Sequence, residues 1–176
     1  MKHIFLTGQV QCGKSTLIRR VLAALGPLKL GGFRSISVLS DIPGAFAEVY
    51  LVPAADEQPA LTRDNLIGIR WSGHGFNAYP AAFDNYGVQL LHRSAPAQLL
   101  LMDELGMMEN AATLFAQAVK QSLDGPIPIL GVVKPRSTPL LDAVRAHPAV
   151  QVIAVDENNR NSLVPVVTEL LRPLIK

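Results

Sequence analysis

A short segment near the amino terminus carries the residue types that bind phosphate. Gly8 and Gly13 are five positions apart and are followed by Lys14 and Ser15, which fits the phosphate-loop pattern. Glycines permit the backbone angles that turn successive N–H groups toward a polyphosphate. The lysine can reach the β- and γ-phosphates, and the serine hydroxyl can bind a Mg²⁺ ion that also holds phosphate oxygens. The segment therefore predicts a nucleoside triphosphate site with Mg²⁺ as its cofactor.

The predicted nucleotide-binding residues form one continuous stretch, of which Lys14 is also expected to be catalytic. They are Gly8, Gln9, Val10, Gln11, Cys12, Gly13, Lys14, Ser15 and Thr16. The alternative is a strand-to-helix turn with a helix cap and no ligand. The order of elements favours the nucleotide site, because an apolar strand precedes the loop and an amphipathic helix follows it.

Two carboxylates follow an apolar strand in the second half of the chain. Asp103 and Glu104 come directly after residues 98–102, and the carboxyl ends of strands are where open α/β sheets bind ligands. Asp103 would hold Mg²⁺ together with Ser15, and Glu104 would orient or deprotonate the attacking water. Taken alone, the two acids could equally be helix caps or surface charges. Glu109, near the next helix start, is expected to have a supporting role, at the helix dipole or at the metal.

The residues around this acidic pair resemble a known family. The segment Asp103-Glu104-Leu105-Gly106-Met107-Met108-Glu109 is similar to the Asp-Glu-Ile-Gly-Lys-Met-Glu signature of the small P-loop nucleoside-triphosphatase family of THEP type, which includes a cancer-related enzyme. The segments Gly32-Phe33-Arg34, Tyr86-Gly87-Val88 and Asn159-Arg160 also resemble family segments. The resemblance implies slow, Mg²⁺-dependent hydrolysis of several nucleoside triphosphates to diphosphate and phosphate by a single P-loop domain.

The late Asn-Arg pair completes the predicted site. Asn159 and Arg160 follow the last predicted strand, so they could contact the base, the ribose or the phosphates. The family resemblance favours this nucleotide-binding role over the alternative of a capping asparagine and a surface arginine.

The chain departs from the family pattern at several positions. Gln11 stands where family phosphate loops usually carry another glycine, and it is expected to narrow or re-angle the phosphate cradle. Met107 replaces the usual lysine and removes a positive charge beside the acidic pair. Ser35, Ile36 and Ser37 replace the family's Thr, Glu and Arg, so no substrate contact is carried over to that strand.

Arginine placement would decide whether turnover is fast or slow, because an arginine on the γ-phosphate raises the rate by about 10³ to 10⁵. Arg34, Arg136 and Arg160 are the candidates, and the sequence does not distinguish them. Trp71 and Phe76 could form a mobile wall over the nucleotide, although burial in the core is the simpler expectation.

The elements that must position these residues alternate along the chain. Strands are predicted at 3–7, 33–39, 45–52, 67–71, 98–102, 127–133 and 150–155, and helices at 14–25, 86–93, 110–123 with Asn110 as cap, 139–146 and 161–171. A glycine-rich loop is expected at 72–75. The pattern indicates an α/β P-loop NTPase fold, a three-layer sandwich with a mainly parallel sheet, helices on both faces and an added antiparallel hairpin at 33–52. One domain, 1–176, is expected.

Composition narrows the partners. The chain has 176 residues, 49% of them hydrophobic, a net charge of +2 and one cysteine, Cys12, so no internal disulfide can form. No Lys/Arg run exceeds Arg19-Arg20, which gives no strong nucleic-acid signal. No apolar run approaches the roughly 18 residues that span a bilayer, and no signal peptide is evident. A cytoplasmic monomer or weak oligomer with no membrane partner is expected, and the four histidines lack zinc-ligand spacing.

Two other function classes fit the same platform. A kinase would pass the γ-phosphate to a nucleoside or another small acceptor, and it would need an acceptor pocket and usually an arginine-rich lid, for which Arg63 and Arg70 are the only hint. A non-enzymatic nucleotide-dependent switch is the other alternative. The sequence has no Asn-Lys-x-Asp base motif, which argues against a GTP-selective switch.

Overall fold

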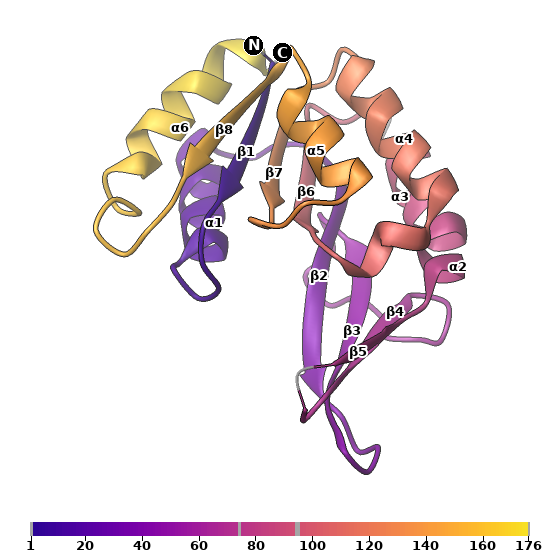
Figure 1. Cartoon of the computed structure of the whole chain (residues 1–176). Helices are drawn as coiled ribbons and strands as arrows, with labels where there is room; N and C mark the ends of the chain where they lie inside the picture. Colours follow the sequence, from indigo (N-terminus) through magenta and orange to yellow (C-terminus); the bar gives the residue numbers. More distant parts are fainter. Residues whose placement is uncertain (1, 74, 94–95, 176) are drawn as a thin grey trace.

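The structure is a computed structural model that describes residues 2–73, 75–93 and 96–175. His74, in the predicted glycine-rich loop, lies outside these ranges. In the described part of the chain, eight strands form one sheet in the order β5-β4-β3-β2-β6-β7-β1-β8 (Figure 1). The strands are β1 His3–Thr7, β2 Leu30–Leu39, β3 Ala45–Pro53, β4 Leu66–Trp71, β5 Phe76–Ala78, β6 Leu99–Leu105, β7 Ile129–Val133 and β8 Val150–Ala154.

The sheet has a parallel half and an antiparallel half. Strands β2, β6, β7, β1 and β8 pair in parallel, whereas β2 to β5 pair antiparallel. Strand β7 is buried at every position, as expected for a parallel strand with both faces covered. The antiparallel strands extend beyond the helical layers (Figure 1), so their inner side faces the carboxyl ends of the parallel strands. The predicted hairpin is confirmed, and β4 and β5 enlarge it.

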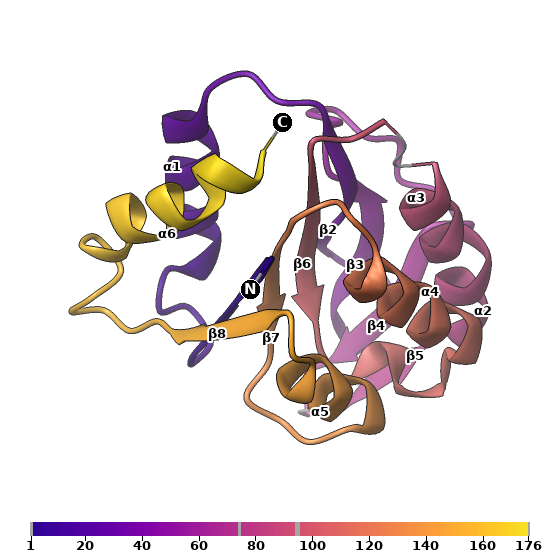
Figure 2. The ribbon, with the colours of Figure 1, turned by 90° about the horizontal axis from the view of Figure 1, so that it is seen from above.

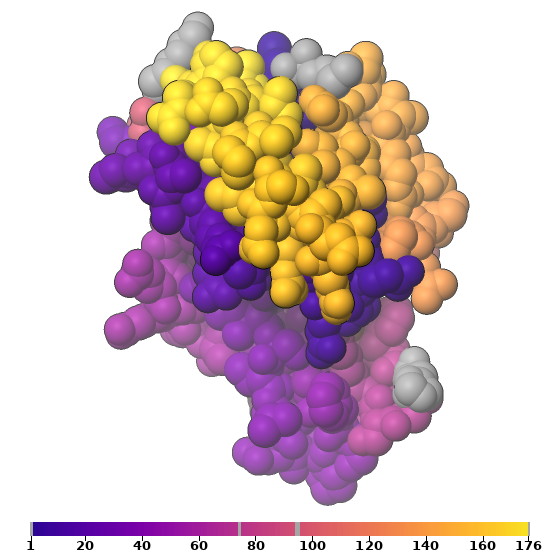
Figure 3. All heavy atoms as spheres, turned by 90° about the vertical axis from the view of Figure 1, so that its left-hand side faces the viewer, coloured from indigo at the N-terminus to yellow at the C-terminus, as the bar shows by residue number. Residues whose placement is uncertain are grey.

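Helices cover both faces of the parallel half (Figure 2). Helices α1 Lys14–Leu25 and α6 Leu163–Leu171 pack on one face, where Leu17, Val21 and Val167 join one apolar cluster. Figure 3 shows α6 lying over α1 on that side. On the other face lie α3 Val88–His92, α4 Thr113–Asp124 and α5 Pro139–Ala146. The predicted three-layer P-loop architecture is therefore confirmed.

Two predicted helices differ from the structure. The helix expected at 86–93 consists of α2 Pro80–Ala82, a π-helical turn Phe83–Gly87 and α3. Gly87 lies in that turn, where an added Cβ would sit 2.8 Å from a ring carbon of Phe115, so the turn packs closely on α4. The hydrophobic periodicity predicts one helix here, whereas the structure has α2, a π-helical turn and α3 in succession.

The helix expected at 110–123 begins later, so the prediction of Asn110 as its cap was wrong. A 3₁₀ turn, Met108–Ala111, precedes α4, and Ala112 occupies the cap position. The reason lies in Glu109, whose carboxylate accepts a hydrogen bond from the Gly106 N–H and whose carbonyl accepts one from the Ala112 N–H at 2.9 Å. These bonds keep the segment in a compact loop. A second 3₁₀ turn, Arg172–Leu174, follows α6. No helix within the described ranges is long and apolar enough to cross a membrane.

Candidate active site

The phosphate loop joins β1 to α1 in a conformation that requires its two signature glycines. Gly8 has a φ of +146°, and an added Cβ would lie 2.1 Å from the Val155 carbonyl oxygen. Gly13 has a φ of +103°, and an added Cβ would lie 2.7 Å from Cδ of Arg160. A side chain would be strained at either position, and at Gly8 it would also be blocked by backbone, whereas at Gly13 the Arg160 side chain would have to move. The loop therefore has the conformational features that the sequence pattern predicts.

Lys14 is folded back over this loop. Its side chain is buried, and Nζ donates to the carbonyl oxygens of Gly8 at 2.9 Å and Gln9 at 2.7 Å. The same nitrogen lies 3.6 Å from Sγ of Cys12. An ammonium group needs oxygen acceptors when it is withdrawn from water, and the loop carbonyls supply them. Phosphate oxygens can take over this role at the same nitrogen.

Gln11 adopts the left-handed conformation, with a φ of 63°. A residue with a Cβ is disfavoured there relative to glycine by roughly 1 kcal/mol or more. This observation gives a physical reason why glycine would suit that position better than glutamine. It also identifies Gln11 as a locally strained position in the loop.

The acidic pair lies on β6, which continues through Asp103 and Glu104 to Leu105 rather than ending at Met102 as predicted. Ser15, Ser35, Asp103 and Glu104 line a hollow of about 140 Å³. Burial and the neighbouring Glu104 carboxylate raise the pKa of Asp103 to about 6, although Lys14 and Arg34 oppose the rise. Asp103 is therefore a carboxylate that lacks sufficient compensating positive charge.

This hollow fits a magnesium ion. Mg²⁺ prefers oxygen ligands and usually keeps several waters while it binds one or two carboxylates and substrate phosphates. The Ser15 hydroxyl and the Asp103 carboxylate offer that chemistry in the same hollow. No group of three or more His, Cys, Asp or Glu side chains is arranged to hold a metal within the described residues. The predicted set thus suits an ion that shares its ligands with a nucleotide.

Glu104 forms an ion pair that the sequence does not reveal. Its Oε1 lies 2.7 Å from Nζ of Lys134, and each side chain is a little over one quarter exposed. Glu109 has a different environment, because its carboxylate is buried and accepts the Gly106 N–H. Burial raises the pKa of Glu109, and its contact with Gly106 shapes the loop after β6. In the structure Glu109 therefore supports the acidic segment.

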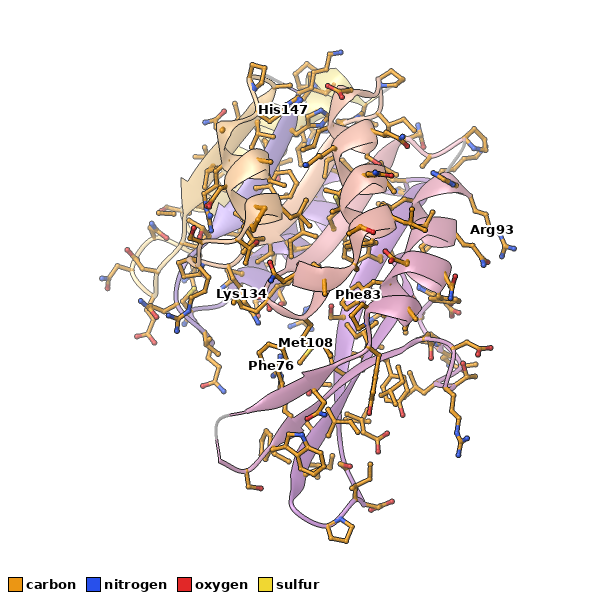
Figure 4. All side chains as sticks on the ribbon, turned by 45° about the vertical axis from the view of Figure 1, so that its right-hand side comes forward. Phe76, Phe83, Arg93, Met108, Lys134 and His147 are labelled. Atoms are coloured by element: carbon orange, nitrogen blue, oxygen red, sulfur yellow. The ribbon has the colours of Figure 1, made fainter. Side chains whose placement is uncertain are left out.

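A cleft of about 650 Å³ opens beside the phosphate loop. Its positively charged lining residues come from distant parts of the chain: Lys14 from α1, Arg70 from β4, and Lys134 and Arg136 from the segment after β7. Its lining also includes the exposed apolar residues Val10, Phe76 and Met107. Figure 4 shows Phe76, Met108 and Lys134 around the region between the antiparallel strands and the helices. The cleft joins positive charge to apolar surface.

Trp71 and Phe76 were expected to be buried in the core, but neither is. Phe76 is 43% exposed and lines the cleft, so its expected burial was wrong. It lies on β5, a three-residue strand at the edge of the sheet that pairs with residues 68–70 of β4, and its ring is open to the cleft. Nε1 of Trp71 donates to Oδ1 of Asn77 at 2.7 Å, and Trp71 is not among the residues that line the cleft.

The candidate arginines separate in space. Arg34 donates to the Asp56 carbonyl at 2.5 Å, which holds its guanidinium in a backbone contact. Arg136 lines the cleft, and Arg160 packs against Gly13. Arg63 lines a different cavity, between residues 60–66 and α2, and does not join Arg70.

Asn159 and Arg160 occupy different environments in the loop after β8. The Asn159 side chain donates to the Ala154 carbonyl at 3.1 Å and accepts from the Asp156 N–H at 2.9 Å. Its amide therefore fixes the loop, whereas Arg160 lies directly beside the phosphate loop. Of the predicted pair, Arg160 is the one that the structure brings to the phosphate site.

Lys134 was not predicted from the sequence as a member of this site, and Arg70 was named only, together with Arg63, as a hint of an arginine-rich lid. Lys134 directly follows a buried parallel strand. Ligands bind at the carboxyl ends of such strands, and Lys134 could therefore have been found in the same way as Asp103. Arg70 had no comparable signal, because its position depends on how β4 pairs within the antiparallel half.

Comparison with known proteins identifies the family of the chain. A family model described as NTPase matches residues 3–168. The chain belongs to this NTPase family. Membership confirms the resemblance seen in the acidic segment and the NTPase enzyme class expected from it.

Individual relatives of this NTPase cover nearly its whole length. It is 29% identical to the cancer-related nucleoside-triphosphatase of Homo sapiens, over 93% of each chain. It is 25% identical to the nucleoside-triphosphatase THEP1 of a Thermotoga species, over 96% of this chain and 95% of the relative. The solution structure of a human cancer-related nucleoside triphosphatase matches with a TM-score of 0.69 and 25% identity over all of both chains. The crystal structure of THEP1 from Aquifex aeolicus, at 20% identity, shares the fold, with a TM-score of 0.73 over 96% and 98% of the chains.

Proposed function

We propose that this NTPase hydrolyses several nucleoside triphosphates to diphosphate and phosphate with Mg²⁺ as cofactor. The observation that carries the proposal is the single hollow beside Lys14 into which Ser15, Asp103 and Glu104 all open. Relatives over nearly the full length are named nucleoside-triphosphatases, which supports the same reaction. The triphosphate would follow the loop from Gly8 to Thr16.

Each residue has a distinct proposed role. The loop N–H groups and Lys14 bind the phosphates, and the Ser15 hydroxyl and Asp103 carboxylate hold Mg²⁺. When bound, Mg²⁺ neutralises charge that develops on the phosphate oxygens. Glu104 orients the attacking water and accepts its proton while the water oxygen bonds to the γ-phosphorus. The bond to the β-phosphate oxygen breaks, and the diphosphate leaves with the electron pair. Arg160 is proposed to contact the nucleotide at Gly13.

The test is phosphate release from ATP, GTP, CTP and UTP, with and without Mg²⁺. Natural enzyme should release phosphate from several of them, and only with the metal. Glu104→Gln keeps the size of the side chain and removes its basicity, so turnover should fall by about 10² or more. Glu57→Gln, a matched change at an exposed site, should leave turnover unchanged. Tight nucleotide binding without phosphate release by the natural enzyme would contradict the proposal.

The cleft favours a kinase as the second candidate function. Arg70, Lys134 and Arg136 converge beside the phosphate loop together with Phe76, so positive charge and apolar surface are available to a phosphoryl acceptor. A hydrolase releases diphosphate and phosphate in equal amounts. A kinase given its acceptor releases diphosphate in excess over phosphate, and this ratio can be measured with added nucleosides. A ratio of one with every nucleoside would reject nucleosides as acceptors.

A further inference from the structure

Lys134 is held beside the acidic segment by its own backbone. It follows β7, the strand between β1 and β6, and its N–H donates to the Leu105 carbonyl at 2.9 Å. Its carbonyl accepts hydrogen bonds from the Arg136 N–H at 2.8 Å and from the Arg145 guanidinium. The main chain is therefore fixed on both sides, while the long side chain reaches into the cleft.

The ammonium group of Lys134 is paired weakly with Glu104, and a bound γ-phosphate would attract it more strongly. Its ion pair with Glu104 is partly exposed, and such pairs contribute only about 0 to 1 kcal/mol. Both residues line the same cleft as Lys14 and Ser15. The terminal phosphate of a bound triphosphate would bring more negative charge to this cleft than one carboxylate carries. A flexible lysine can move to it, because its three N–H donors sit on a rotatable stem.

We propose that Lys134 exchanges partners when a triphosphate binds. Without nucleotide its Nζ pairs with Glu104, and with nucleotide it donates to a γ-phosphate oxygen. The exchange releases Glu104 to accept a hydrogen bond from the attacking water. A diphosphate has no γ-phosphate and leaves the ion pair intact. This inference rests on the proposed function, and it adds a residue that reports the presence of the γ-phosphate to Glu104.

Lys14, which lines the same cleft, supports this interpretation because it has the same kind of arrangement. Its Nζ also rests on protein oxygens, those of Gly8 and Gln9, that phosphate oxygens can replace. The other ion pairs within the described residues, Arg145–Asp142, His147–Asp124 and Arg172–Glu169, include no residue that lines the cleft. Of the ion pairs in this part of the chain, the Lys134–Glu104 pair is therefore the one that the substrate can open.

The test is a double-mutant cycle on binding, which avoids turnover. Affinities for a non-hydrolysable ATP analogue with an imido β,γ-bridge and for ADP are measured with Mg²⁺, for the natural enzyme, Glu104→Gln, Lys134→Met and the double variant. Glu104→Gln removes the competing acceptor, so it should strengthen binding of the analogue. The gain should be about two- to fivefold larger in the natural background than in the Lys134→Met background, which is the strength of the broken ion pair. ADP should show no such difference.

A matched variant distinguishes the partner exchange of Lys134 from the general effect of a positive charge in the cleft. Arg136→Gln removes a positive charge from the same cleft but has no Glu104 ion pair among the described contacts, so its effect should add to that of Glu104→Gln. Equal gains in the natural and the Lys134→Met backgrounds, measured on variants that retain the natural melting temperature, would overturn the exchange. Lys134→Gln replaces Lys134→Met if the latter does not fold. Binding of the analogue with no cycle coupling rejects only the exchange, whereas absence of all nucleotide binding rejects the proposed function as well.

Discussion

The carboxyl and amino ends of the parallel strands differ in how they hold buried ionisable groups. At the carboxyl ends of β1 and β6, Lys14 rests on loop carbonyls and Asp103 is a buried carboxylate with a pKa raised to about 6. At the amino ends, His3 is fully buried and Nε2 lies 2.9 Å from the Leu123 carbonyl oxygen. His147 lies beside it and contacts Asp124 at 3.2 Å. The carboxyl end holds charged groups that a nucleotide can contact. At the amino end, the buried His3 ring has one hydrogen-bond partner in the backbone, and its Nδ1 has none among the described residues.

We therefore expect residues that serve function at the carboxyl ends of the strands, and residues that serve only stability at the amino ends. Groups at the carboxyl end should lower the unfolding free energy of the nucleotide-free protein and be essential to turnover. Groups at the amino end should affect stability alone.

Lys14→Ala should separate activity from stability most strongly. The variant removes the only lysine in the phosphate loop, so kcat/KM for phosphate release should fall by about 10² to 10³. The melting temperature should fall much less than the activity, because the described hydrogen bonds of the lysine go only to loop carbonyls and Cys12, although its charge also favours the ionised Asp103. Lys29→Ala, an exposed lysine near the amino end of β2, is the matched control and should keep full activity. Loss of activity in both variants would break the comparison.

Asp103→Asn should stabilise the nucleotide-free protein while it abolishes turnover. The folded state holds the Asp103 proton more tightly than the unfolded state, so ionisation at neutral pH disfavours folding. The variant should gain about 2 to 3 kcal/mol in unfolding free energy at pH 8, the order implied by a pKa rise from 3.8 to about 6. The gain should shrink as the pH falls from about 6 and vanish near 3.8. Urea titrations over this range check it, and an unchanged or lower stability at pH 8 would contradict it.

His3→Gln tests the amino end. Burial lowers the pKa of His3 below 6.5, with the neighbouring His147 adding to the effect, so protonation favours the unfolded state. Stability from this site is therefore present above pH 6.5 and is lost as the pH falls below it. The variant should therefore lose less stability than the natural enzyme as the pH falls from 7 to 5, as measured by urea titration. Its phosphate release at pH 7.5 should be unchanged, and His92→Gln, at an exposed site, should show the natural pH dependence.

Gln11→Gly should give the smallest effect. Glycine relieves the left-handed conformation at φ 63° but also adds freedom to the unfolded chain, so the net gain in unfolding free energy should be below about 1 kcal/mol. Gln9→Gly, at a residue outside the positive-φ region, should instead destabilise. A loss of stability in Gln11→Gly equal to that in Gln9→Gly would show that the loop is not strained.

Much of this molecule could be predicted because its signals are local. The phosphate loop, the buried strand β7 and the amphipathic helix α1 follow from residue type and spacing over a dozen positions or fewer. The acidic pair was found because it ends an apolar run. Arg70 was raised only as a hint of a lid, and Phe76 as one side of a wall over the nucleotide with burial as the simpler expectation. The sequence could not decide either position, because both depend on pairing between β3, β4 and the short strand β5. The start of α4 was missed because Glu109 bonds back to Gly106, a contact without a periodic pattern.

The position of β1 in the sheet has a consequence for how the enzyme is made. Its register partners are β7, where His3 faces Ile129, and β8, where His3 faces Val150. The segment that carries the phosphate loop is synthesised well before its neighbours in the sheet, which are more than 100 residues further along the chain. Such distant pairing slows folding and leaves early apolar strands exposed. A nascent chain halted before residue 129 should therefore hold the complete loop sequence and yet be unable to retain a nucleotide.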